Sequence, residues 1–205
     1  MADSLVIRKR PGFCFAVLLL VVPSVALAHL VNSGLGPIYD GALHLLLSPG
    51  DVLGLVALAL LSGLRGAKTG RMTVMSLSLA WLLAGLAGLN LPAVPVLPWL
   101  LVVSLVVPGA MVAFDLKLPP VVVATLAALY GVLHGLLNGS ALASVGAGNT
   151  ALLGIVMTVL LISLLISAAV VPLRGIWSRI AVRVAGSWVA AVGILMFGWL
   201  TQGNV

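Results

Sequence analysis

The side chains that could do chemistry in this sequence are few, and most of them lie inside apolar segments. The chain has 205 residues, with three histidines and four acidic residues. Asp40 precedes His44 by one helical turn, and His134 precedes Asn138 by the same interval. This spacing places each pair on one face of a helix. Ionisable groups in apolar spans are costly, so both pairs are candidate functional residues.

These residue types suit a divalent transition-metal cation. Imidazole and carboxylate ligands together are preferred by borderline cations such as Ni²⁺, Co²⁺ and Zn²⁺. The single cysteine, Cys14, falls in a segment that we expect to be removed, which leaves no thiolate ligand and no disulfide. The structural alternatives are that a membrane histidine only hydrogen-bonds a neighbouring helix and that Asn138 only caps a helix end. Tyr39 and Tyr130 fit either tuning of the site or anchoring at the interface.

Asp51 has two interpretations. It follows His44 by two helical turns, which places it on nearly the same face and on the path of an ion. The sequence Ser48-Pro49-Gly50-Asp51 also matches a helix start, with serine at the N-cap, proline at the first position and aspartate at the third. Both interpretations stay open, and a helix broken at this point would frame a transport site.

The composition indicates a membrane protein. Of the residues, 62% are hydrophobic and 7% are charged, and long apolar runs of this kind indicate transmembrane spans. The net charge of +6 does not indicate a nucleic-acid partner, because the basic residues fall in short loop clusters without a basic face or a known motif. Membrane lipid is therefore the expected surrounding.

The N-terminus is typical of a secretory signal peptide over residues 1–28. The basic residues 8–10 precede the apolar stretch 13–22 and the cleavage pattern Ala26-Leu27-Ala28. Cleavage there would make His29 the first residue of the mature domain, 29–205, where its amine and imidazole would bind an entering metal ion together. The alternatives are an uncleaved first transmembrane helix and a His29 without function.

Hydropathy and helix breakers predict an all-α, polytopic bundle of about six transmembrane helices after the signal. Basic residues follow the first, third and fifth spans, so these loops are predicted to be cytoplasmic and the mature N-terminus extracytoplasmic. Asp115 and Lys117, after the third span, are expected to form a solvated loop pair. The expected spans are 38–64, 72–90, 96–114, 120–140, 150–173 and 178–200.

Two motifs in this order resemble a known family. The stretch from His29 through Gly34-Leu35-Gly36-Pro37-Ile38-Tyr39-Asp40-Gly41-Ala42-Leu43-His44 is similar to the first membrane segment of the hydrogenase and urease accessory proteins of the HupE/UreJ family. Leu133-His134-Gly135-Leu136-Leu137-Asn138-Gly139 is similar to its second histidine motif. The better-described branch carries a histidine directly after the aspartate of this segment, whereas Val52 follows Asp51 here. Asn138 likewise stands where a second histidine is common. The resemblance implies a nickel or cobalt permease that supplies metalloenzymes.

We therefore expect a permease for a divalent transition-metal cation in the bacterial inner membrane, with Ni²⁺ first and Co²⁺ second. The ion is cargo, and neither a tightly bound cofactor nor enzymatic activity is expected. The alternative is a non-transporting accessory protein that binds metal or a partner for hydrogenase or urease assembly. A third interpretation, an intramembrane hydrolase, would use Ser140 or Ser144 beside His134 but lacks a nucleophile motif. The expected metal ligands are His29, Asp40, His44, Asp51, His134 and Asn138.

Overall fold

The structure is all-helical, as the sequence predicted. The computed structural model describes residues 33–91, 94–95 and 97–202. The signal peptide predicted over residues 1–28 and the candidate ligand His29 lie outside the described residues. The helices of the described chain are α2 (Pro37–Leu46), α3 (Pro49–Leu64), α4 (Ala67–Gly88), α5 (Pro98–Ala113), α6 (Pro120–Ser144), α7 (Gly148–Val170) and α8 (Ile176–Gln202).

The first predicted span is broken. α2 and α3 meet at Leu47 and Ser48 with a bend of 76° between them. Pro49 lacks a backbone N–H and its ring disfavours a helical residue before it, so the helix restarts there. Ser48 occupies the N-cap position that the sequence predicted, but no side chain caps α3. The Ser48 hydroxyl instead donates to the carbonyl oxygen of His44 at 2.7 Å.

By length and composition the described helices include four or five candidate membrane spans, close to the roughly six predicted. α4, α6, α7 and α8 are each long and apolar enough to cross a membrane, and the bent pair α2 and α3 would be a fifth span. α5 has only 16 residues. At the rise of an α-helix these reach about 24 Å, which is less than the roughly 30 Å of a hydrocarbon core.

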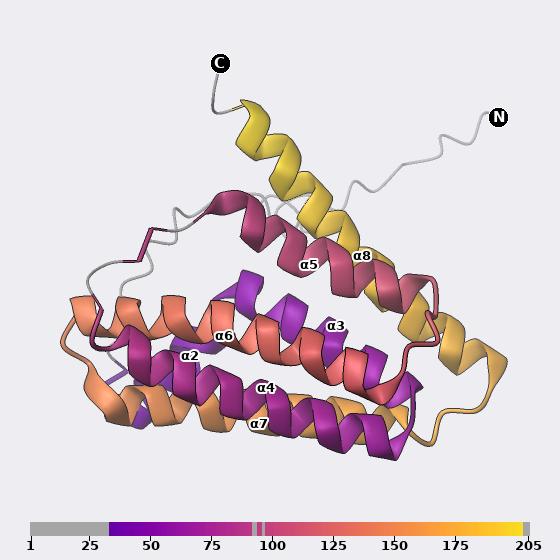
Figure 1. The fold of residues 1–205 in the computed structure, drawn as a ribbon, viewed down its shortest axis with the longest axis horizontal. Helices are drawn as coiled ribbons and strands as arrows, with labels where there is room; N and C mark the ends of the chain where they lie inside the picture. The colour runs from indigo at the N-terminus through magenta and orange to yellow at the C-terminus, as the bar shows by residue number, and fades with distance from the viewer. Residues whose placement is uncertain (1–32, 92–93, 96, 203–205) are drawn as a thin grey trace, which may run out of the picture.

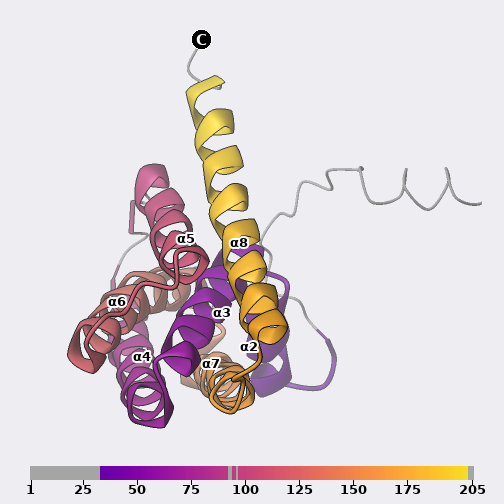
Figure 2. The same cartoon turned by 90° about the vertical axis from the view of Figure 1, so that its right-hand side faces the viewer.

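α3 is the central helix of the bundle. Figure 2 shows it between α4, α6 and α7 on one side and α5 and α8 on the other. In Figure 1, α4, α6 and α7 run side by side along the bundle, while α8 extends out of it. Nine of the 16 residues of α3 are buried. A helix that is apolar nearly all round belongs in such a central position.

Glycines allow α6 to pack closely against α4. A Cβ atom on Gly135 would lie 2.5 Å from the carbonyl oxygen of Trp81, and one on Gly139 would collide with the backbone of Gly85. Small residues at this spacing allow helix backbones to approach without intervening side chains. This packing fixes the position of α6, which carries His134.

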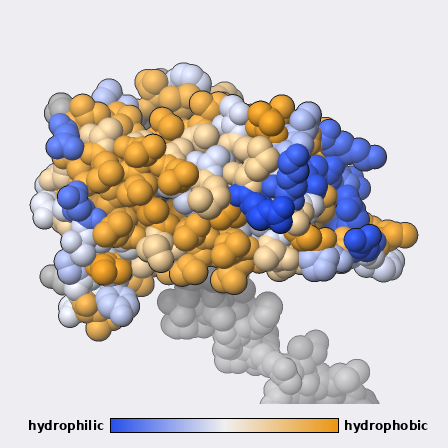
Figure 3. All heavy atoms as spheres, turned by 60° about the horizontal axis from the view of Figure 1, so that its bottom comes forward, coloured by the Kyte–Doolittle hydropathy of each residue, from blue (hydrophilic) through white to orange (hydrophobic). Residues whose placement is uncertain are grey.

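The charged residues gather toward one end of the bundle. Figure 3 shows a largely apolar face with a large group of hydrophilic residues at one end and a smaller one at the other. Asp115 has a φ of 52° and accepts hydrogen bonds from Arg65 and, at 2.8 Å, from Arg179. The predicted pairing of Asp115 with Lys117 is therefore wrong, because the fold brings two arginines from distant helices to the same carboxylate.

Opposing effects act on the Asp115 carboxyl. Burial raises its pKa, but hydrogen bonds and charges from Arg179 and Arg65 outweigh burial and hold that pKa below its ordinary value. The side chain of Arg65 is only 9% exposed. Asp115 therefore neutralises a buried guanidinium and joins the end of α3 to the start of α8.

Candidate functional site

A carboxylate and an imidazole meet where α3 crosses α6. Asp51 lies in the first turn of α3, and His134 lies on α6 with an exposed fraction of only 1%. His134 Nδ1 is 2.5 Å from Asp51 Oδ1. Asp51 therefore does not cap its own helix, because its carboxylate is turned toward α6.

Asn138 holds the second oxygen of the same carboxylate. Its Nδ2 donates to Asp51 Oδ2 at 2.9 Å and to the carbonyl oxygen of His134 at 2.8 Å. Both partners are acceptors, so the amide nitrogen must face them and the amide oxygen must face the other way. Asn138 Oδ1 is buried and has no hydrogen-bond partner within the described part of the chain.

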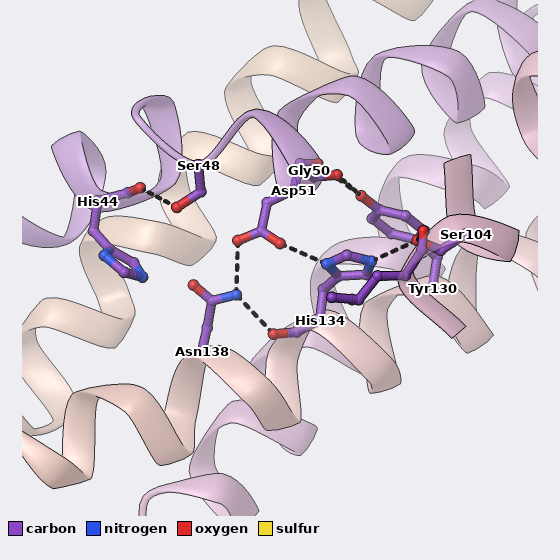
Figure 4. Close-up of polar contacts among 9 residues, drawn as sticks. His44, Ser48, Gly50, Asp51, Ser104, Tyr130, His134 and Asn138 are labelled. Carbon is purple, nitrogen blue, oxygen red and sulfur yellow. Dashed lines mark hydrogen bonds and ion pairs between the residues drawn. The ribbon is translucent and has the colours of Figure 1, made fainter. Parts of the chain in front are cut away.

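The unpartnered Asn138 oxygen points toward His44. Figure 4 shows it on the side of the amide that faces the His44 ring, while the nitrogen faces Asp51. His44 is 9% exposed, and no described side chain hydrogen-bonds its ring. An unpaired buried acceptor is costly. A cation bound beside the His44 ring would supply the partner that this oxygen lacks.

Two aromatic rings pack against His134. Tyr130 stacks on the imidazole with ring centroids 4.0 Å apart, and Trp81 lies 5.8 Å from it. The Tyr130 hydroxyl donates to the carbonyl oxygen of Asp51 at 2.7 Å. Gly54 leaves room for the tyrosine ring, since a Cβ there would collide with it. Tyr130 is thus a buried part of the site and not an interface anchor.

Ser104 of α5 completes the chain of polar groups. Its Oγ lies 3.1 Å from His134 Nε2, so both ring nitrogens of His134 have partners. Sequence reasoning did not single out Ser104. The signal that could have found it is its isolation, because it is the one hydroxyl side chain in the apolar sequence of α5.

The remaining predicted residues are less closely joined. Asp40 lies on α2 and is buried, but its Oδ1 accepts hydrogen bonds from the backbone N–H and the hydroxyl of Ser33, at 2.7 Å and 2.5 Å. In the described chain, no three His, Cys, Asp or Glu side chains form a group that could hold a metal ion. A metal site built from the described residues would therefore include other donors, and Asn138 Oδ1 is a buried, unpartnered oxygen on the side that faces His44.

A search against known protein families matches residues 17–196 to the HupE / UreJ protein family. The chain belongs to the HupE / UreJ family. The resemblance noted in the sequence is thereby confirmed over most of the chain. HupE / UreJ proteins are membrane proteins linked to hydrogenase and urease accessory function, and they are not known enzymes. No curated protein and no solved structure matches the chain.

Proposed function

We propose that this HupE / UreJ protein is a permease of the bacterial inner membrane for a divalent transition-metal cation, with Ni²⁺ as the favoured ion. The observation that carries the proposal is the buried, unpartnered Asn138 Oδ1, which faces the His44 ring while the amide nitrogen of Asn138 donates to the Asp51 carboxylate. Burying an acceptor without a partner is unfavourable unless something binds it. A cation at this point would satisfy the amide oxygen and balance the carboxylate charge.

The available donors fit a cation that binds reversibly. The ion would contact the His44 ring, Asn138 Oδ1 and Asp51 Oδ2, whose spare lone pairs allow a second contact beside the Asn138 hydrogen bond. Nitrogen and oxygen ligands without thiolate suit Ni²⁺ or Co²⁺. Few protein ligands leave positions for water, and a site of this kind can both select an ion and release it.

His134 would support this site from behind. Its Nδ1 already faces Asp51, and carboxylate and imidazole groups joined in this way orient metal ligands in many metal sites. Asp40 would then hold the segment before α2 through Ser33, at the entrance rather than at the ion. With the N-terminus outside, the membrane potential would draw the cation inward.

Uptake of radioactive Ni²⁺ into sealed proteoliposomes tests the proposal, with Co²⁺, Zn²⁺ and Mn²⁺ as competitors. We expect wild-type protein to accumulate Ni²⁺, Co²⁺ to compete best, and the H44A variant to lose uptake at limiting Ni²⁺. L46A is the matched control, because Leu46 lies on the same helix and is 51% exposed. Wild-type vesicles that accumulate no more Ni²⁺ than empty liposomes would contradict transport. Ni²⁺ binding without uptake would favour the non-transporting accessory protein.

A further inference from the structure

Ser104 makes two hydrogen bonds that together define its role. Its Oγ donates to the carbonyl oxygen of Leu101 at 2.8 Å and lies 3.1 Å from His134 Nε2. The Asp51 carboxylate accepts the Nδ1 proton of a neutral imidazole, which leaves Nε2 as an acceptor, so the single Ser104 proton is shared between the Leu101 carbonyl oxygen and His134 Nε2. The imidazole is therefore held at both ends, by Asp51 at Nδ1 and by Ser104 at Nε2.

The Ser104 contact is isolated in its surroundings. Within the described residues, no other hydrogen bond joins α5 to α6. Between α3, α5 and α6 lies a cavity of about 480 Å³, lined almost wholly by apolar side chains, among them Val103, Val107 and Leu133. Ser104 thus reaches His134 beside an apolar space. Close packing of α5 against α6 does not bring Ser104 and His134 together, so the hydrogen bond itself accounts for their approach.

We propose that Ser104 is a positioning residue of the cation site, which acts through His134 on the Asp51 carboxylate. This inference rests on the proposed cation-binding function. The hydroxyl keeps the imidazole turned so that Nδ1 meets Asp51 Oδ1, which leaves Oδ2 on the side of Asn138 and His44. Loss of the hydroxyl lets the ring rotate, and the carboxylate loses its fixed orientation.

The consequence is a change in affinity rather than in maximal rate. Outer partners of metal ligands typically contribute about 10–100-fold in metal affinity. Ser104 stands one group further from the ion, so S104A should raise the half-saturating Ni²⁺ concentration about tenfold, at the lower end of that range. The maximal uptake rate should stay near that of wild type, because all groups proposed to contact the ion remain.

The experiment measures Ni²⁺ uptake into proteoliposomes across a concentration series for wild type, S104A, S104T and S163A. Threonine keeps the hydroxyl, so S104T should restore the wild-type half-saturating concentration. Ser163 is the matched control: it is a buried serine on α7, and within the described residues its hydroxyl donates only to the carbonyl oxygen of Leu160. Thermal unfolding of each variant in detergent reports whether folding is preserved.

The outcomes separate the two proposals. A half-saturating concentration raised in S104A, restored in S104T and unchanged in S163A supports the positioning role. If S104A behaves like S163A while wild type transports Ni²⁺, or if S104T fails to restore the affinity, the positioning role is overturned and the proposed function stands. Wild-type protein that neither binds nor transports Ni²⁺ overturns the proposed function and this inference with it.

Discussion

His134 Nδ1 lies 2.5 Å from Asp51 Oδ1, and this contact joins the start of α3 to the middle of α6. The two residues are 83 positions apart in the chain. Their pairing turns the Asp51 carboxylate away from the end of its own helix and toward Asn138 and His44. The chemistry proposed for this protein depends on that orientation.

Replacement of Asp51 by asparagine should remove the negative charge from the site while keeping a side chain of similar size. We expect the half-saturating Ni²⁺ concentration to rise by more than about tenfold, as for loss of a ligand or its close partner. Equilibrium dialysis of the purified D51N variant with Ni²⁺ measures the effect. Binding by D51N that equals wild type would show that the carboxylate does not contact the ion.

Replacement of Asn138 separates its donor from its acceptor role. N138L loses the buried oxygen and should lose most of the thermal stabilisation that Ni²⁺ gives to wild type, because ligand-induced stabilisation follows affinity. N138D places a second carboxylate beside Asp51, and like charges at this distance repel. N138D should therefore unfold at a lower temperature than wild type without metal and show a larger shift when Ni²⁺ is added. Equal Ni²⁺-induced shifts in all three proteins would contradict this arrangement of ligands.

Replacement of Gly135 by alanine tests how closely α6 must approach α4. An alanine there would place its Cβ 2.5 Å from the carbonyl oxygen of Trp81, which belongs to a backbone that cannot easily move. Overpacking of this kind costs about 1–3 kcal/mol or more. G135A should unfold at a lower temperature, whereas G198A should not, because Gly198 has open space around it in α8. The hypothesis fails if thermal unfolding in detergent ranks G135A and G198A as equal.

Asp115 should contribute to stability through its pairs with Arg65 and Arg179. D115N keeps a residue that tolerates the φ of 52°, so the backbone is not strained. It leaves the buried Arg65 guanidinium without its charged partner, at a cost of about 1–3 kcal/mol. K117Q, which alters the neighbouring charge outside these pairs, is the control expected to unfold like wild type.

The pH dependence of the same contact has a definite sign. The folded pKa of Asp115 lies below its ordinary value of 3.8, so the carboxylate stabilises the fold above that value. The stabilisation is lost as the pH falls through the folded pKa. The thermal unfolding temperatures of wild type and D115N should therefore differ at neutral pH and converge in strong acid. A difference that persists unchanged in acid would show that charge is not the cause.

The sequence alone was sufficient to predict the membrane class, the all-helical fold and the family. These follow from local signals: long apolar runs require helices in lipid, and Pro49 interrupts the first of them. The one-turn spacing of His134 and Asn138 also predicted correctly that both side chains lie on one face, since both reach Asp51. Local spacing decides such features because it depends only on helix geometry.

Only the tertiary structure decided which groups pair. Asp51 fits a helix cap and an ion path equally well in sequence, and the crossing of α3 and α6 turns it to His134. Asp115 was matched to its neighbour Lys117, but the fold brings Arg65 and Arg179 to it instead. No sequence motif pointed to Ser104 as a partner of His134. Partners of this kind depend on the rotation and crossing of helices that are distant in the chain, and helix periodicity carries no information about either.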